Sequence, residues 1–100
     1  MTSRAMLEPD PQALEVLAAA WLGAEDAALA QPTNAGLAEE AARLGEAYEA
    51  AITAASPEDL RIAWEAAQRI QAEQLIGSAE WASARRVSEL LRAEYFALRQ

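Results

Sequence analysis

The carboxylates of segment 34–55 are the only residues present in quantity that could do chemistry. Glu39 and Glu40 are adjacent, and Glu46 precedes Glu49 by about one helical turn. Acids at such spacing on facing helices can hold Mg²⁺ or a pair of metal ions. Glu39, Glu46 and Glu49 nevertheless lie off the apolar positions of the predicted helix, and this pattern favours a solvated face.

The pair Glu39-Glu40 resembles the Glu-Glu pair of the all-α nucleotide pyrophosphohydrolases, which use acids on helices to hold metal. That family adds a later Glu-x-x-Asp, and this sequence contains none. The chain also has no histidine and no cysteine, so the commonest general base and the commonest transition-metal ligands are missing. We therefore expect no enzyme, no bound metal and no cofactor, with a carboxylate–Mg²⁺ hydrolase as the least favoured alternative.

The formal net charge of −8 is distributed unevenly along the chain. Residues 1–56 carry −7 and residues 57–100 carry −1. Such a chain repels nucleic-acid phosphate, so direct nucleic-acid binding is not expected. An alternative function follows from the acids themselves, as an inhibitor that mimics nucleic acid or phosphate toward a basic enzyme. The acidic face for that role would comprise Glu39, Glu46, Glu49, Glu58 and Asp59.

Phe96 is an aromatic residue outside the apolar stripe of its predicted helix, at about 140° from the centre of that stripe by helical geometry. Arg92 and Arg99 lie one helical turn to either side of it, and Arg85 lies on the same side. Aromatic residues and arginine are enriched at the centres of protein interfaces. These four residues are the predicted partner-binding site, unless Phe96 instead covers another helix.

Caps and apolar periodicity predict four helices and no strand. Asp10-Pro11, Ser56-Pro57 and Ser78 are typical helix starts, and residues 31–34 are the clearest break in the chain. Gly23 either ends the first helix or only weakens it. The predicted ranges are 11–22, 34–55, 57–76 and 79–99.

These helices predict an all-α fold: a small four-helix up-and-down antiparallel bundle with a shorter N-terminal helix. Residues 10–100 form its single domain, and residues 1–9 an extension. The spacing of apolar residues gives a candidate core, and the acids named above should be exposed. The six core candidates are Leu44, Tyr48, Leu60, Trp64, Val87 and Leu91.

Alanine accounts for 27 of the 100 residues, so large side chains are few and the core must be thin. Thin cores favour oligomers. Gln71 and Gln74 lie on the apolar stripe of the third helix, which either leaves the core there or pairs across an interface. We expect a non-enzymatic acidic interaction or regulatory protein that self-associates, with a homodimer as the simplest form. No apolar run approaches the ~18 residues of a membrane span, so the cytoplasm is the expected location.

Overall fold

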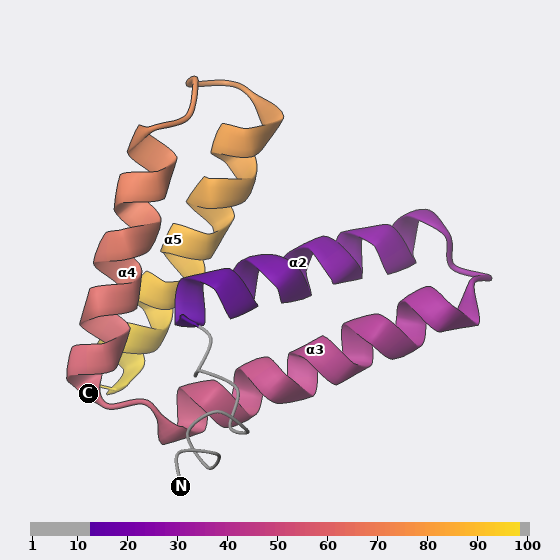
Figure 1. Cartoon of the computed structure of the whole chain (residues 1–100), viewed down its shortest axis with the longest axis horizontal. Coiled ribbons are helices and arrows are strands. Elements are labelled where there is room, and N and C mark those ends of the chain that lie inside the picture. Colours follow the sequence, from indigo (N-terminus) through magenta and orange to yellow (C-terminus); the bar gives the residue numbers. More distant parts are fainter. Residues whose placement is uncertain (1–12, 99–100) are drawn as a thin grey trace, which may run out of the picture.

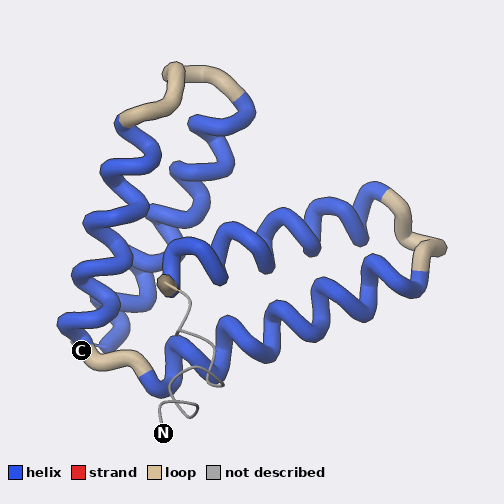
Figure 2. The backbone as a smooth tube through the Cα atoms, in the orientation of Figure 1, coloured by secondary structure: helices blue, strands red, loops and turns tan. Residues whose placement is uncertain are grey.

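The computed structural model describes residues 13–98, and these form four helices (Figures 1 and 2). The helices are α2 (Leu14–Ala30), α3 (Ala35–Ala54), α4 (Pro57–Ala72) and α5 (Ala79–Leu98). No strand occurs between residues 13 and 98. The prediction of an all-α four-helix bundle is therefore confirmed.

The four helices form two antiparallel hairpins that meet at a wide angle (Figure 1). Helix α2 packs along α3, and α4 packs along α5. The N-terminal half of α2 also lies against the second hairpin, and it makes most of the contacts between the two hairpins. Beyond this crossing, each arm of the molecule is only one pair of helices thick.

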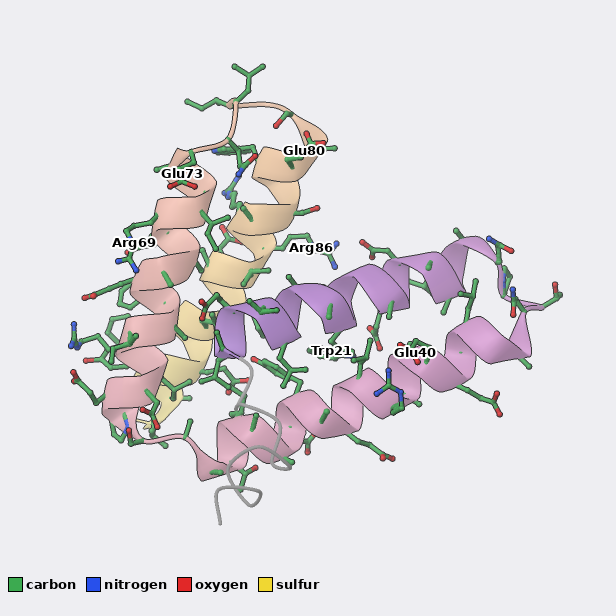
Figure 3. The ribbon with its side chains drawn as sticks, viewed as in Figure 1. Trp21, Glu40, Arg69, Glu73, Glu80 and Arg86 are labelled. Atoms are coloured by element: carbon green, nitrogen blue, oxygen red, sulfur yellow. The ribbon has the colours of Figure 1, made fainter. Side chains whose placement is uncertain are left out.

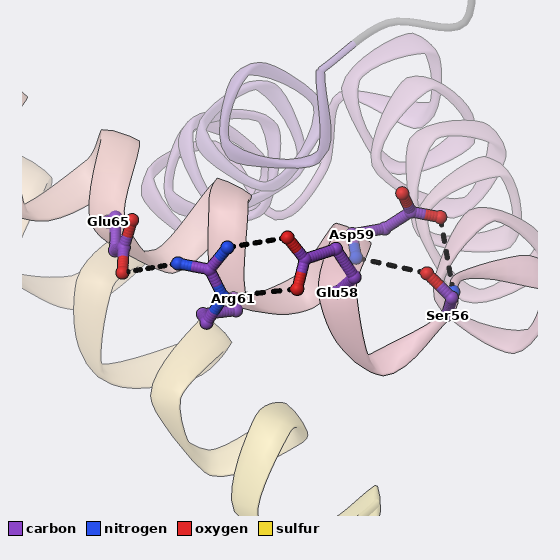
Figure 4. Close-up of polar contacts among 5 residues, drawn as sticks. All are labelled: Ser56, Glu58, Asp59, Arg61 and Glu65. Carbon is purple, nitrogen blue, oxygen red and sulfur yellow. Dashed lines mark hydrogen bonds and ion pairs between the residues drawn. The ribbon is translucent and has the colours of Figure 1, made fainter.

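Side-chain caps define three of the helix starts, and the sequence predicts two of them, at Ser56 and Ser78. The Asn34 side chain accepts a hydrogen bond from Leu37 N at 3.3 Å at the start of α3. At the start of α4, Asp59 N donates to Ser56 Oγ at 3.0 Å while Ser56 N donates to Asp59 Oδ2 at 3.1 Å (Figure 4). Ser78 Oγ accepts from Trp81 N at 3.0 Å before α5. Each cap satisfies backbone donors that have no partner inside the helix, and a cap of this kind contributes about 1 kcal/mol.

The predicted end of the first helix near residue 22 is wrong, and the alternative that Gly23 only weakens this helix is confirmed, because α2 continues through Gly23 to Ala30. With 17 residues it is comparable to α4 rather than a short N-terminal helix. A helical glycine costs about 1 kcal/mol relative to alanine, but it does not stop a helix whose next turns are rich in alanine. The helix begins at Leu14, and the predicted cap at Asp10-Pro11 lies outside the described residues.

Helix α4 ends at Ala72, four residues before the predicted end at 76. Leu75 and Ile76 lie in the turn to α5, where each is 80% exposed. Gln74 also lies beyond the helix end, and its Nε2 donates to Ile70 O at 3.2 Å. The apolar stripe thus leaves the core near this end, in agreement with the first of the two interpretations of Gln71 and Gln74.

The core lies where the hairpins cross, and all four helices contribute to it. Ala18 and Leu91 are completely buried there, and Tyr48 and Val87 are more than nine-tenths buried. Small alanines let the helix backbones approach closely, which compensates for the few large side chains. Of the six predicted core residues, Leu44 and Trp64 are partly buried against this cluster. The other four, Tyr48, Leu60, Val87 and Leu91, are buried.

Truncating the centre of this crossing should destabilise the whole domain. We expect Leu91→Ala to lower the free energy of unfolding by about 2–5 kcal/mol, because it removes a fully buried side chain and leaves a cavity. Leu75→Ala is the matched control, since its 80% exposed side chain should contribute less than about 0.5 kcal/mol. Urea denaturation measures both values. Equal losses in the two variants would contradict the core described here.

Candidate functional site: an arginine–aromatic face and an acidic groove

The predicted interface residue Phe96 is 42% exposed, and one side of its ring is covered. The ring packs edge-on against Trp64 of α4, with 5.8 Å between centroids, and against Tyr95, with 5.3 Å. Arg92 Cζ lies 5.1 Å from the Phe96 centroid, which is cation–π geometry. We call Trp64, Arg92 and Phe96 the arginine–aromatic face. Phe96 therefore both covers a neighbouring helix and presents part of its ring to solvent.

The structure groups only part of the predicted partner-binding set. Arg92 contacts Phe96, whereas Arg85 lies 5.6 Å from the centroid of Trp81 near the other end of α5. Arg85 also pairs with Glu89 at 2.9 Å, so its charge is largely compensated. Arg99 lies outside the described residues. Arg92 makes no ion pair within residues 13–98.

A second feature is an open groove of about 1110 Å³ between α2, α3 and α5. Four alanines of α3, together with Ile52, Leu90 and Trp21, contribute to its apolar lining. Four carboxylates line it and no arginine does. We call this feature the acidic groove, and its acids are Glu25, Glu46, Glu49 and Glu94.

Trp21 lies between α2 and α3, as Figure 3 shows, and its position depends on a glycine. Its ring stacks on Tyr48 with 5.0 Å between centroids and 20° between planes. A Cβ atom on Gly45 would lie 2.9 Å from Trp21 Nε1, which is closer than a carbon atom can approach. The lack of a side chain at Gly45 is therefore what allows the indole to lie flat against α3.

Tyr48 connects the core to the acidic groove. Its hydroxyl donates a hydrogen bond to Glu94 Oε2 at 3.1 Å. Burial raises the pKa of Tyr48 well above its usual value of 10.0, and the negative charge of Glu94 together with this hydrogen bond raises it further. The phenol therefore remains a neutral donor, and it holds the Glu94 carboxylate at the groove.

The predicted acidic face is divided between different environments. Glu46 and Glu49 are exposed as expected and line the groove, whereas Glu39 is exposed outside it. Glu58 pairs with Arg61 at 2.5 Å (Figure 4), and the hydrogen bond from Arg61 holds its pKa below the usual value. Asp59 forms the cap at Ser56. Two of the five acids are thus engaged in contacts at the start of α4.

Three of the residues that line the groove were not predicted from the sequence: Trp21, Glu25 and Glu94. Glu25 follows Gly23, where the first helix was expected to end, so it was not placed on a helix face. Trp21 fits the apolar stripe of its helix and reads as a core residue. Only the packing of α2 against α3 and α5 brings Glu94 beside Glu46 and Glu49, and helical periodicity contains no signal for that contact.

A smaller pocket of about 420 Å³ lies between α2 and the second hairpin. Leu22, Ile70 and Val87 contribute to its apolar lining. The ion pair between Arg86 of α5 and Asp26 of α2, at 2.7 Å, joins the helices beside it, and Figure 3 shows Arg86 extending toward α2. Arg86 is the one arginine that lines this pocket, and its charge is therefore paired with an acid of the same chain.

Neither a metal centre nor a membrane span is found in the part of the chain that the structure describes. No group of three or more acidic, histidine or cysteine side chains within residues 13–98 is arranged to hold a metal ion. None of the helices in the same range is both long enough and apolar enough to cross a bilayer. Comparisons of the sequence with protein-family models, with curated proteins and of the fold with solved structures find no match. The function must therefore be argued from the residues.

Two helical glycines should respond oppositely to the same substitution. Gly23→Ala should raise the free energy of unfolding by about 0.4–1 kcal/mol, because the added methyl meets nothing within 4 Å and the helix gains a better helix former. Gly45→Ala should lower it by about 1–3 kcal/mol, because its methyl collides with the Trp21 ring. Thermal unfolding and near-ultraviolet circular dichroism of the Trp21–Tyr48 stack measure the effects. A stabilised Gly45→Ala variant would contradict the close approach.

The raised pKa of Tyr48 predicts a specific loss of stability in alkali. The folded state holds the phenol proton more tightly than the unfolded state, so this contribution is complete below pH 10 and is lost as pH rises above it. We expect Tyr48→Phe to cost about 0.5–1.5 kcal/mol at neutral pH through the lost hydrogen bond, yet to lose stability more gradually above pH 10. Urea titrations across this pH range test both effects. Identical pH profiles for the variant and the wild type would refute the role of Tyr48.

Proposed function

We propose that this chain is a non-enzymatic protein-interaction or regulatory protein that self-associates through the arginine–aromatic face. The observation that carries the proposal is Phe96, a residue that remains 42% exposed and whose ring contacts an arginine without an ion pair in the described chain. An aromatic side chain and an arginine in contact can bury a large area with little loss of conformational freedom. Such a pair is typical of the centre of an interface.

The distribution of exposed apolar side chains supports the same proposal. Within residues 13–98, eight large hydrophobic residues are at least 42% exposed. Six belong to the second hairpin, where they lie at its turn and near the ends of its helices. This excess of exposed apolar side chains favours the second hairpin, rather than the first, as the one that carries a binding surface. The six are Ile62, Ile70, Leu75, Ile76, Phe96 and Leu98.

The alternative of a phosphate mimic is less well supported by this geometry. Glu58 and Asp59, two of the five acids that it needs, are held by Arg61 and by the helix cap. Of the remaining three, Glu46 and Glu49 line the acidic groove, whereas Glu39 is exposed outside it. Self-association through Phe96 does not require that any of these acids leave its present contacts.

Substituting the exposed aromatic residue should weaken self-association without loss of the fold. We expect Phe96→Asp to lower the association constant by at least about tenfold, or about 1.4 kcal/mol, because a charge replaces the apolar centre of the contact. Arg92→Glu should act in the same direction and leaves the ring packing of Phe96 on Trp64 in place. Analytical ultracentrifugation measures association, and far-ultraviolet circular dichroism verifies the helices.

Leu29→Asp is the matched control, because Leu29 is 77% exposed near the end of α2 that points away from the second hairpin. It should not lower the association constant. A wild-type protein that sediments as a monomer at every concentration would refute the proposal. An equal loss in Leu29→Asp would show that general apolar contact, rather than this face, joins the copies.

A further inference from the structure

We infer that the arginine–aromatic face of one copy binds in the acidic groove of a second copy, so that the copies associate head to tail. This inference rests on the proposed function, because it names the surface that the face contacts. It assigns the second copy's Glu46 and Glu49 as partners of Arg92, and the groove's apolar wall as the surface that receives Phe96.

The composition of the groove sets the chemistry of its occupant. Glu25, Glu46 and Glu49 make no ion pair within residues 13–98, and Glu94 accepts only the neutral hydroxyl of Tyr48. Four carboxylates that have no ion-pair partner in the described part of the chain attract a positively charged group. Apolar side chains and Trp21 form the rest of the lining, so the occupant should also present apolar surface.

One surface of this chain combines those two properties. Of the six described arginines, four are paired with acids of their own chain, and only Arg69 and Arg92 are not. Arg92 alone of these two lies over a partly exposed aromatic ring. Its positive charge and the ring of Phe96 therefore complement the negative, apolar groove. The paired arginines are Arg43, Arg61, Arg85 and Arg86.

The face cannot reach the groove of its own chain. Leu90 and Glu94 of α5 line the groove. Arg92 follows Leu90 by two residues, and Phe96 follows Glu94 by two residues. Two residues turn an α-helix by about 200°, so the face and the groove lie on opposite sides of α5. The contact must therefore join two molecules. Because the face and the groove lie on opposite sides of α5, two copies cannot each place their face in the other's groove. The association is therefore head to tail, and it adds further copies unless the rotation between them closes a ring.

The test uses charge reversal on both sides of the contact, in the full chain. Arg92→Glu alters the face, and the double variant Glu46→Arg/Glu49→Arg alters the groove at two exposed positions. Each protein alone should lose self-association by at least about tenfold, because like charges then meet. An equimolar mixture should regain association, because every contact between the two proteins joins opposite charges. Sedimentation velocity at low salt measures all three samples, and added salt should weaken the wild-type contact.

A control double variant, Glu39→Arg/Glu73→Arg, changes the net charge equally at two exposed acids outside the groove. It should associate like the wild type. If it loses association to the same extent, net charge rather than the groove is responsible and the inference is wrong. If Arg92→Glu weakens association but Glu46→Arg/Glu49→Arg does not, the proposed function stands and the groove assignment fails. A monomeric wild type overturns both, and a mixture that stays dissociated overturns the pairing.

Discussion

The close packing of alanines where the two hairpins cross is the constraint on which the rest of the structure depends. Ala18 of α2 is completely buried, and Ala63 and Ala67 of α4 are nearly so. Small side chains bring the helix axes together, and Leu91 and Tyr48 then fill the space between them. Because this single cluster joins all four helices, the arms beyond it receive little support from the opposite hairpin.

This arrangement explains why a chain with few large side chains leaves so many of them exposed. A helix in a two-helix arm packs against one neighbour, so a large part of its circumference meets solvent. Ile62 and Phe96 lie on such surfaces of the second hairpin, at 52% and 42% exposure. The acidic groove has the same origin, since it opens where α2 and α3 diverge from α5. The exposed apolar surface and the unpaired charges of the groove thus both follow from the contact of the two hairpins at a single crossing.

Local signals in the sequence were sufficient for the existence of the four helices and for two of the three residues of the arginine–aromatic face. The caps at Asn34, Ser56 and Ser78 are side-chain contacts over three residues, and the contact between Arg92 and Phe96 spans one helical turn. Both are separations of three or four residues along the chain, which helical periodicity can predict. Gly23 misled the prediction because a glycine lowers helix stability by an amount that the surrounding residues can offset.

The groove could not be predicted because it depends on contacts between distant parts of the chain. The spacing of Glu46 and Glu49 indicates a solvated face, and the structure shows both exposed. Their proximity to Glu25 and Glu94 follows only from the packing of three helices. Trp64 was predicted as a core residue, and its part in the arginine–aromatic face was missed for a similar reason, since its contact with Phe96 joins residues of two antiparallel helices.

Tyr48 shows how the fold and the candidate site depend on each other. Its ring belongs to the buried cluster and stacks on Trp21, while its hydroxyl holds Glu94 at the edge of the groove. The stack in turn requires that Gly45 carry no side chain. A change in the core at Tyr48 therefore alters both the apolar wall and one carboxylate of the groove. Conversely, a cation bound beside Glu94 would lower the negative potential at Tyr48, and so reduce the electrostatic part of the rise in its pKa. Binding in the groove and the protonation of a core residue are thus linked through a single hydrogen bond.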